Sequence, residues 1–386
     1  MPTIDTDVET ALVLAQSDLD GGRLARALQA ARALDVEATV ATERTEAARL
    51  RAQAAYRLGE FDEAADAAQR VLDRLGGQAP TYPARLRVLA ISVVAAAEVA
   101  RYEQALGHLQ QLLSAASRGS LEEFVHARAT AATCFALLGD PWAGQRLLSE
   151  LLGLFQGLPS ESALEAVARR NHATVCLLIA RLAREAGDTA GCDEALDHAD
   201  ASLQRTRELG RLTRDERIGS YAELQACEAA LLRGNAGAVF GVLQAAVDQA
   251  ATVGLAARAR YLRVVLGEAC VDAGDPARAL RVLREADGAL HEGHDLGLRI
   301  RCLQALQRAF EASADPTQAL THAARARVLE LHRHYRQART QSHFLRTRLE
   351  LEHLYRYRSS ASRGISSRSG ALTAPAALDA SIPPRR

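Results

Sequence analysis

The stretch YRLGEFDEAADAAQRVLDRL, residues 56–75, decides the fold of this chain. In this stretch Gly59 is followed two residues later by Phe61, five residues later by Ala64 and twelve residues later by Val71. Glycine lets the backbone turn sharply between two helices, and a small residue such as alanine lets the second helix approach the first closely. The stretch therefore predicts two antiparallel helices that are joined by a turn at Gly59.

The same pattern recurs along the chain. Small residues that could form such a turn are separated by 37 to 48 residues, at Gly22, Gly59, Ala100, Gly139, Gly187, Gly234, Gly274 and Ala314. The fifth residue after each turn is never larger than valine: Ala27, Ala64, Ala105, Gly144, Cys192, Val239, Ala279 and Ala319. The twelfth residue after each turn is apolar in every unit. These columns stay in phase over eight units and predict eight helix pairs over residues 8–330.

The repeat resembles the tetratricopeptide motif, although its period is longer than the 34 residues usual for that motif. It is similar to the extended repeats of bacterial signalling regulators, including activators of the maltose-regulator type and the sensory half of diguanylate cyclases. The resemblance implies an all-α, right-handed superhelical solenoid whose concave surface is lined by the first helix of each pair. It also implies a non-catalytic scaffold or sensor that binds a protein or peptide, in bacterial signalling or regulation.

The composition agrees with this interpretation and excludes several classes of enzyme. Hydrophobic residues make up 48% of the chain but aromatic residues only 4%, so Ala, Leu and Val supply most of the apolar surface, as is typical of closely packed helices. The sequence contains no lysine. P-loop nucleotide hydrolases, protein kinases and Schiff-base enzymes all need a lysine at the site of chemistry. We therefore expect neither enzymatic activity nor a cofactor.

The cysteines and the N-terminus indicate a cytoplasmic protein. The six cysteines are dispersed without a CxxC pair, which favours small buried residues in a reducing compartment over a disulfide framework or a zinc site. The N-terminal residues lack the apolar core of a signal peptide. The most apolar stretch, residues 88–97, is too short to cross a bilayer.

One short segment contains residues that are common metal ligands. His291 and His294 occur in the sequence HEGHD, which lies between two expected helices. No third histidine or cysteine is near them in the sequence, and a zinc site needs at least three protein ligands. The sequence therefore predicts no metal site.

The candidate partner-binding residues are polar side chains on the first helix of each pair. Those that we expect to line the groove are Arg49, Gln53, Arg87, His126, Arg181, Arg184, Glu228 and Glu268. Arg181 and Arg184 lie one helical turn apart and could hold a carboxylate through paired hydrogen bonds. Glu228 and Glu268 would meet a basic group. The alternative is that these side chains form an ordinary solvated polar face.

The C-terminal part of the chain differs from the repeats. Residues 325–358 contain neither glycine nor proline and predict one long helix. Apolar and small residues on it follow heptad spacing, at Val328, Leu331, Tyr335, Ala338, Ser342, Leu345 and Leu349. This spacing predicts a short coiled coil and a homodimer through it, whereas a helix that merely caps the solenoid is the alternative. Residues 359–386 are rich in Ser, Ala, Pro and Arg and should be disordered.

Charge is distributed unevenly along the chain. The formal net charge is zero, yet residues 320–386 carry 13 arginines and only 4 acidic residues. A basic end of this kind is typical of contact with nucleic acid, so an Arg-rich nucleic-acid-associated transcriptional regulator is the alternative function. Neither a GGDEF motif nor a helix-turn-helix follows the long helix in this sequence. We therefore expect a protein or peptide partner, and neither nucleic acid nor a membrane.

Overall fold

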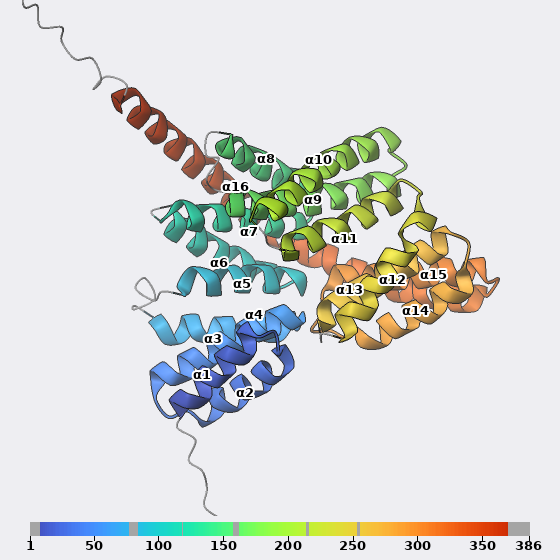
Figure 1. Ribbon diagram of the computed structural model, residues 1–386, viewed down its shortest axis with the longest axis horizontal. Coiled ribbons are helices and arrows are strands. Elements are labelled where there is room, and N and C mark those ends of the chain that lie inside the picture. Colours follow the sequence, from blue (N-terminus) through green and yellow to red (C-terminus); the bar gives the residue numbers. More distant parts are fainter. Residues whose placement is uncertain are drawn as a thin grey trace, which may run out of the picture. The chain divides into compact units, whose positions relative to one another are not determined.

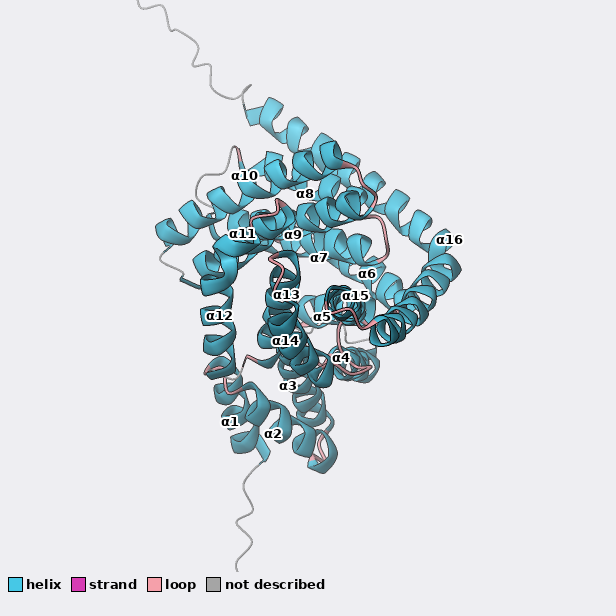
Figure 2. Ribbon diagram, turned by 90° about the vertical axis from the view of Figure 1, so that its right-hand side faces the viewer, coloured by secondary structure: helices cyan, strands magenta, loops and turns pink. Residues whose placement is uncertain are grey.

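The computed structural model describes residues 8–76, 84–117, 119–156, 162–213, 216–252 and 255–369. Every regular element in these ranges is a helix, from α1 to α16 (Figure 1, Figure 2). The chain divides into two compact units, Met1–Gln341 and Ser342–Arg386. The all-α fold class predicted from the sequence is confirmed.

The helices of the first unit form eight consecutive pairs. The first helices are α1 (Val8–Asp20), α3 (Ala41–Leu58), α5 (Arg85–Glu98), α7 (Leu121–Leu137), α9 (Ser162–Glu185), α11 (Glu216–Leu232), α13 (Ala256–Asp272) and α15 (Leu296–Ala312). The second helices are α2 (Leu24–Glu37), α4 (Phe61–Leu75), α6 (Tyr102–Ala116), α8 (Pro141–Phe155), α10 (Thr189–Thr213), α12 (Ala236–Thr252), α14 (Pro276–Ala289) and α16 (Pro316–Ser369). We refer to these pairs as repeats one to eight.

The turn within every pair has the same backbone conformation. All eight predicted turn residues have a positive φ, which ranges from 57° at Ala314 to 97° at Gly139. A residue in this left-handed region ends a helix because the amide groups at the turn then bond back to the last carbonyls. At the second turn, for example, the amide of Glu60 donates to the carbonyl oxygen of Ala55 at 2.9 Å. The sequence spacing therefore located every turn correctly.

Small residues allow the two helices of a pair to pack closely. All eight residues at the fifth position after a turn are buried. The tightest case is Gly144, where an added Cβ would lie 2.6 Å from the carbonyl oxygen of Ala132 on the preceding helix. The six cysteines are also buried and unpaired, as expected. Alanine, leucine and cysteine side chains thus form a core that continues from one pair to the next.

The last helix differs in length from its prediction. α16 combines the second helix of the eighth repeat with the predicted C-terminal helix, residues 325–358, and runs on to Ser369. It therefore extends into the segment that was predicted to be disordered from residue 359. Residues 370–386 lie outside the described residues. Within the described ranges, no helix combines the length and the hydropathy that a bilayer span requires.

The second and seventh repeats contact each other directly, although about two hundred residues separate them. α13 packs against α3, and a Cβ added to Gly59 would lie 2.8 Å from the Cβ of Ala257. The buried Arg260 guanidinium donates to the carbonyl oxygen of Leu58 at 2.6 Å. In the loop between α14 and α15, the carbonyl oxygen of Gly293 accepts from the amide of Asp62 at 3.1 Å.

Candidate functional site

The first helices of repeats five to eight enclose a cavity of about 350 Å³. Its walls come from α9, α11, α13 and α15 and are largely charged. The lining residues are Arg181, Arg184, Glu185, Leu231, Leu232, Glu268, Asp272, Arg301, Gln304, Gln307 and Arg308. This cavity contains three of the residues that the sequence predicted for a partner-binding groove.

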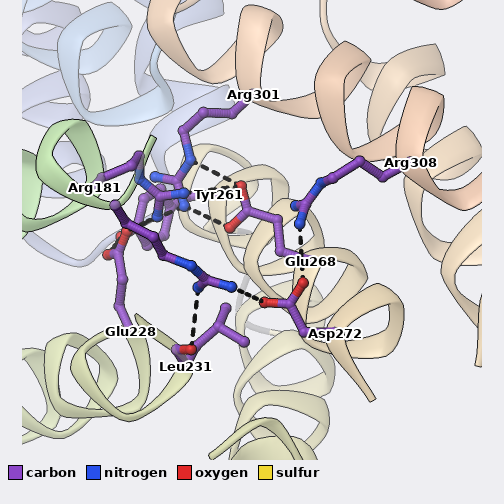
Figure 3. Close-up of polar contacts among 9 residues, drawn as sticks. Arg181, Glu228, Leu231, Tyr261, Glu268, Asp272, Arg301 and Arg308 are labelled. Atoms are coloured by element: carbon purple, nitrogen blue, oxygen red, sulfur yellow. Dashed lines mark hydrogen bonds and ion pairs between the residues drawn. The ribbon is translucent and has the colours of Figure 1, made fainter. Parts of the chain in front are cut away.

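Two arginines and two glutamates form a buried ion-pair network at the floor of the cavity (Figure 3). Arg181 reaches Glu228 at 2.6 Å and Glu268 at 3.3 Å. Arg301 reaches Glu268 at 2.8 Å and Glu228 at 3.1 Å. The hydroxyl of Tyr261 donates a further hydrogen bond to Glu228. Each carboxylate is thus shared by the same two guanidinium groups, which come from α9 and α15.

The network keeps both carboxylates ionised. Burial acts to raise the pKa of the Glu268 carboxyl, but Arg181 and Arg301 outweigh burial and lower that pKa to about 2. Burial also acts on Glu228, where Arg301 and Arg181 outweigh it and lower the pKa. Burial alone would lower the pKa of Arg301, but Glu268 and Glu228 raise it well above the usual range. The network is therefore a set of fixed charges at neutral pH.

A second cluster lies at the mouth of the cavity and is more exposed. Arg184 and Arg308 contact the two carboxylate oxygens of Asp272, at 3.2 Å and 2.9 Å. Arg184 also donates to the carbonyl oxygen of Leu231 at 3.4 Å. Both guanidinium side chains are 42% exposed, whereas Asp272 is 14% exposed. Two cations therefore share the carboxylate of Asp272, while Glu185 also lines the cavity.

The other predicted groove residues lie elsewhere. Arg49 and Gln53 are buried and share a hydrogen bond of 3.0 Å, and Arg49 also donates to Gln16 at 2.8 Å. The contact with Gln16 joins α3 to α1. Arg87 and His126 are exposed on α5 and α7, outside the cavity of repeats five to eight.

The structure thus brings together Arg181, Arg184, Glu228 and Glu268, which the sequence placed on the first helices of three different repeats. The sequence did not anticipate that Arg181 would pair with the two glutamates rather than stand ready for a partner. It also missed Tyr261 and Arg301. Both lie thirteen residues before the turn of their own repeat, as the predicted groove residues Arg87 and His126 do, and this shared position could have identified them.

Comparisons with known proteins support the fold. No protein-family model and no curated protein sequence matches this chain. The structure is similar to the crystal structure of a Rap protein complexed with Competence and Sporulation Factor, with a TM-score of 0.61, 12% identity, and coverage of 87% of this chain and 89% of that chain.

Two other solved structures resemble this chain more distantly. A tetratricopeptide repeat protein from Parabacteroides merdae has a TM-score of 0.43, with 13% identity and coverage of 78% of this chain and 98% of that chain. Yeast Tom70 has a TM-score of 0.26, with 11% identity and coverage of 96% and 100%. Of these three similarities, we use only that to the Rap protein, and it supports the fold alone. The chain is therefore a tetratricopeptide-type helical solenoid.

Proposed function

We propose that this chain is a non-catalytic scaffold or sensor that binds a peptide, or an extended segment of a partner protein, in the cavity of repeats five to eight. The inner face of a helical solenoid is the surface on which such proteins commonly bind extended partners. The similar Rap protein was solved with Competence and Sporulation Factor bound, which supports a binding role for the fold. A role in bacterial signalling is part of the same proposal.

Arg184 and Arg308, the two arginines at the mouth of the cavity, are the main support for this proposal. Arg181 and Arg301 are already neutralised by two buried glutamates. Arg184 and Arg308 share a single carboxylate and remain partly exposed. A guanidinium group binds a carboxylate through paired hydrogen bonds. The partner is therefore a segment that carries an acidic side chain or a free C-terminal carboxylate.

A peptide library tests this site. Peptides with free C-termini are selected on the immobilised full chain, and the affinity of the enriched peptides is measured by titration calorimetry. Replacement of both arginines, Arg184→Gln with Arg308→Gln, should weaken binding about tenfold or more, because each charged hydrogen bond contributes roughly 1.5–3 kcal/mol. Helicity should not change, because Asp272 can remain hydrated at the open mouth.

The matched control is Arg325→Gln. Arg325 forms a similar exposed ion pair with Asp287, at 3.1 Å, on the second helices α16 and α14. This control should bind the selected peptides with the affinity of the unmodified chain. Equal affinity of the double variant and the control would refute the proposed site. Binding that is unaffected both by removing the acidic side chains of a selected peptide and by amidating its C-terminus would refute it too.

The C-terminal helix supplies a second candidate surface. The predicted seam residues Val328, Leu331 and Tyr335 on α16 are 64%, 52% and 62% exposed. Exposed apolar side chains at heptad spacing are typical of a helix that pairs with another helix. This exposure supports the proposed homodimer, but Arg327, Arg333 and Arg336 lie on the same stretch of helix as the seam against the single acid Glu330, so two copies would bring like charges together. An acidic amphipathic helix of another protein therefore fits the seam better.

The mass of the chain in solution distinguishes these partners. Light scattering on the full chain should show a monomer, and Leu331→Asp with Tyr335→Asp should leave that mass unchanged. A dimer that the double substitution dissociates would instead establish pairing between copies.

A separate measurement tests the alternative function, nucleic-acid binding. Affinity for DNA or RNA that falls steeply with salt, and that is lost when residues 342–386 are deleted, would favour this alternative.

A further inference from the structure

Three common metal ligands meet where the second repeat contacts the seventh. Glu60 follows the turn at Gly59, and His291 and His294 lie in the loop between α14 and α15. The Nε2 atom of His294 is 3.1 Å from Oε1 of Glu60, and the Nε2 atom of His291 is 3.3 Å from Oε2 of the same carboxylate. One ligand atom of each of the three residues lies within 4.8 Å of the others.

The two segments that carry these residues are held together by contacts outside the cluster. The amide of Asp62 donates to the carbonyl oxygen of Gly293 at 3.1 Å. Arg260 donates to the carbonyl oxygen of Leu58 at 2.6 Å. The three side chains therefore do not depend on one another alone for their positions, and their proximity is part of the fold.

The cluster is partly open to solvent. The side chain of His294 is 3% exposed, that of Glu60 is 26% exposed and that of His291 is 61% exposed. Glu60 and His291 line a hollow of about 470 Å³ whose other charged residues are Asp62, Glu63, Asp66, Arg32, Arg51 and Arg70. An ion could enter from this hollow, and water within it could complete the coordination.

The donor set and its spacing suit a zinc-like ion. Two imidazole nitrogens and one carboxylate oxygen, with water in the fourth position, form a common tetrahedral zinc site with bonds of about 2.0–2.1 Å. Ligand atoms in such a tetrahedron lie about 3.3 Å apart. One ligand atom of each of the three residues lies within 4.8 Å of the others, so the side chains need to move only slightly closer together around an ion. We propose that Glu60, His291 and His294 bind a divalent transition-metal ion such as Zn²⁺, which links the second repeat to the loop before the eighth.

The hydrogen bonds of the two rings set the affinity of this site. Nδ1 of His294 accepts from the amide of His291 at 3.0 Å, and Nδ1 of His291 accepts from the amide of Gly293 at 3.2 Å. In the metal-free protein each neutral ring therefore carries its proton on Nε2, facing Glu60. A metal ion at Nε2 moves that proton to Nδ1 and displaces the backbone amide. The ion thus binds with a change in the loop, and more weakly than in a closed structural zinc site.

Zinc titration of the full chain tests the proposal. Calorimetry on chelator-treated protein should show one equivalent of Zn²⁺ bound with micromolar affinity. Co²⁺ should give the visible absorption of a tetrahedral site. Because His291 is mostly exposed, His291→Gln should fold normally, which circular dichroism verifies. It should weaken Zn²⁺ binding by more than the roughly 10–100-fold that is typical of losing an outer-shell partner, because a ligand itself is removed. Zn²⁺ should raise the melting temperature of the unmodified chain but not of this variant.

Two other histidines provide matched controls. His126 and His198 are exposed, and each faces a single glutamate one helical turn away at 3.9 Å. His126→Gln and His198→Gln should leave the first equivalent of Zn²⁺ unchanged. The proposal is overturned if the unmodified chain binds no Zn²⁺ at micromolar concentration. It is also overturned if His291→Gln binds as the unmodified chain does, or if the controls lose as much affinity as His291→Gln, since the ion is then adventitious.

Discussion

At the scale of single residues, the turns show what each repeat requires of its sequence. Six of the eight turn residues are glycine, which tolerates a positive φ without strain. Ala100 and Ala314 are the non-glycine residues of the described chain with such a φ, at 60° and 57°. A Cβ atom in this region is crowded by the following carbonyl oxygen. These two turns are therefore strained by comparison with the other six.

Replacing Ala314 by glycine should stabilise the protein. Ala314 is exposed, so the substitution removes strain without creating a cavity, and we expect a gain of about 0.5–1 kcal/mol in the free energy of unfolding. The control is Ala324→Gly, at an exposed position inside α16, which should lose about 1 kcal/mol because glycine is a poor helix former. Urea denaturation followed by circular dichroism measures both changes, and the same sign for the two would contradict the argument.

Arg181 and Arg184 should differ in their effect on stability. Arg181 is 15% exposed and pairs with two buried glutamates, so Arg181→Ala should destabilise the chain by roughly 3 kcal/mol. Arg184 is 42% exposed, and Asp272 keeps Arg308, so Arg184→Ala should cost less than about 1 kcal/mol. Thermal melting of the two variants provides the comparison. Similar melting temperatures would show that the buried network contributes little.

At the scale of elements, the buried network joins all four inner helices of repeats five to eight, with Glu228 supplied by α11. α9 supplies Arg181, α15 supplies Arg301, and α13 supplies Glu268, which receives both arginines. α9 and α13 are not consecutive inner helices, since α11 lies between them in the chain. The ion pairs therefore stabilise a particular arrangement of these helices, in addition to the apolar core that they share with the outer helices.

This network should make stability depend on acid pH. The folded pKa of Glu268 is about 2, below its ordinary value of 4.5, so its contribution is complete above pH 4.5 and is lost as the pH falls toward 2. Glu268→Gln should lower stability at pH 7 and flatten this part of the pH profile. Urea midpoints measured from pH 7 to pH 2 test this, and parallel profiles for the two proteins would contradict it.

At the scale of the whole first unit, the contact between the second and seventh repeats is the least ordinary feature. In a solenoid each repeat normally touches only its neighbours. Here Gly59 and Ala257 approach closely, and Arg260 reaches the backbone of α3. The absence of a side chain at Gly59 serves two purposes at once, because it permits the positive φ of the turn and the close approach of α13.

A bulky residue at position 257 should open this contact. Ala257→Trp places an indole where Gly59 lies, so the hydrogen bond from the Asp62 amide to Gly293 should break. Hydrogen exchange measured by mass spectrometry should then accelerate in peptides that span residues 56–62 and 291–295. The control is Ala324→Trp at an exposed position on α16, where exchange should not change. Unchanged protection in the Ala257→Trp variant would show that the contact is not maintained in solution.

The local pattern of the sequence was sufficient to determine the repeats. Turn residues, small residues five positions later and apolar residues twelve positions later are all set by contacts within one helix pair. Such contacts recur at fixed spacing, so eight pairs and eight turns could be predicted without any knowledge of the tertiary structure. Arg181, Glu228 and Glu268 likewise occupy equivalent positions, six residues before the turns of three successive repeats.

Only the tertiary structure decided how these side chains are used. Whether Arg181 meets a partner or Glu228 depends on the distance between inner helices of different repeats, and no local spacing specifies that distance. The meeting of Glu60 with His294 joins residues 234 positions apart and depends on the accumulated geometry of five intervening repeats. The sequence therefore determined the fold of each repeat by itself, whereas long-range packing determined which charges are neutralised and which remain available for a ligand.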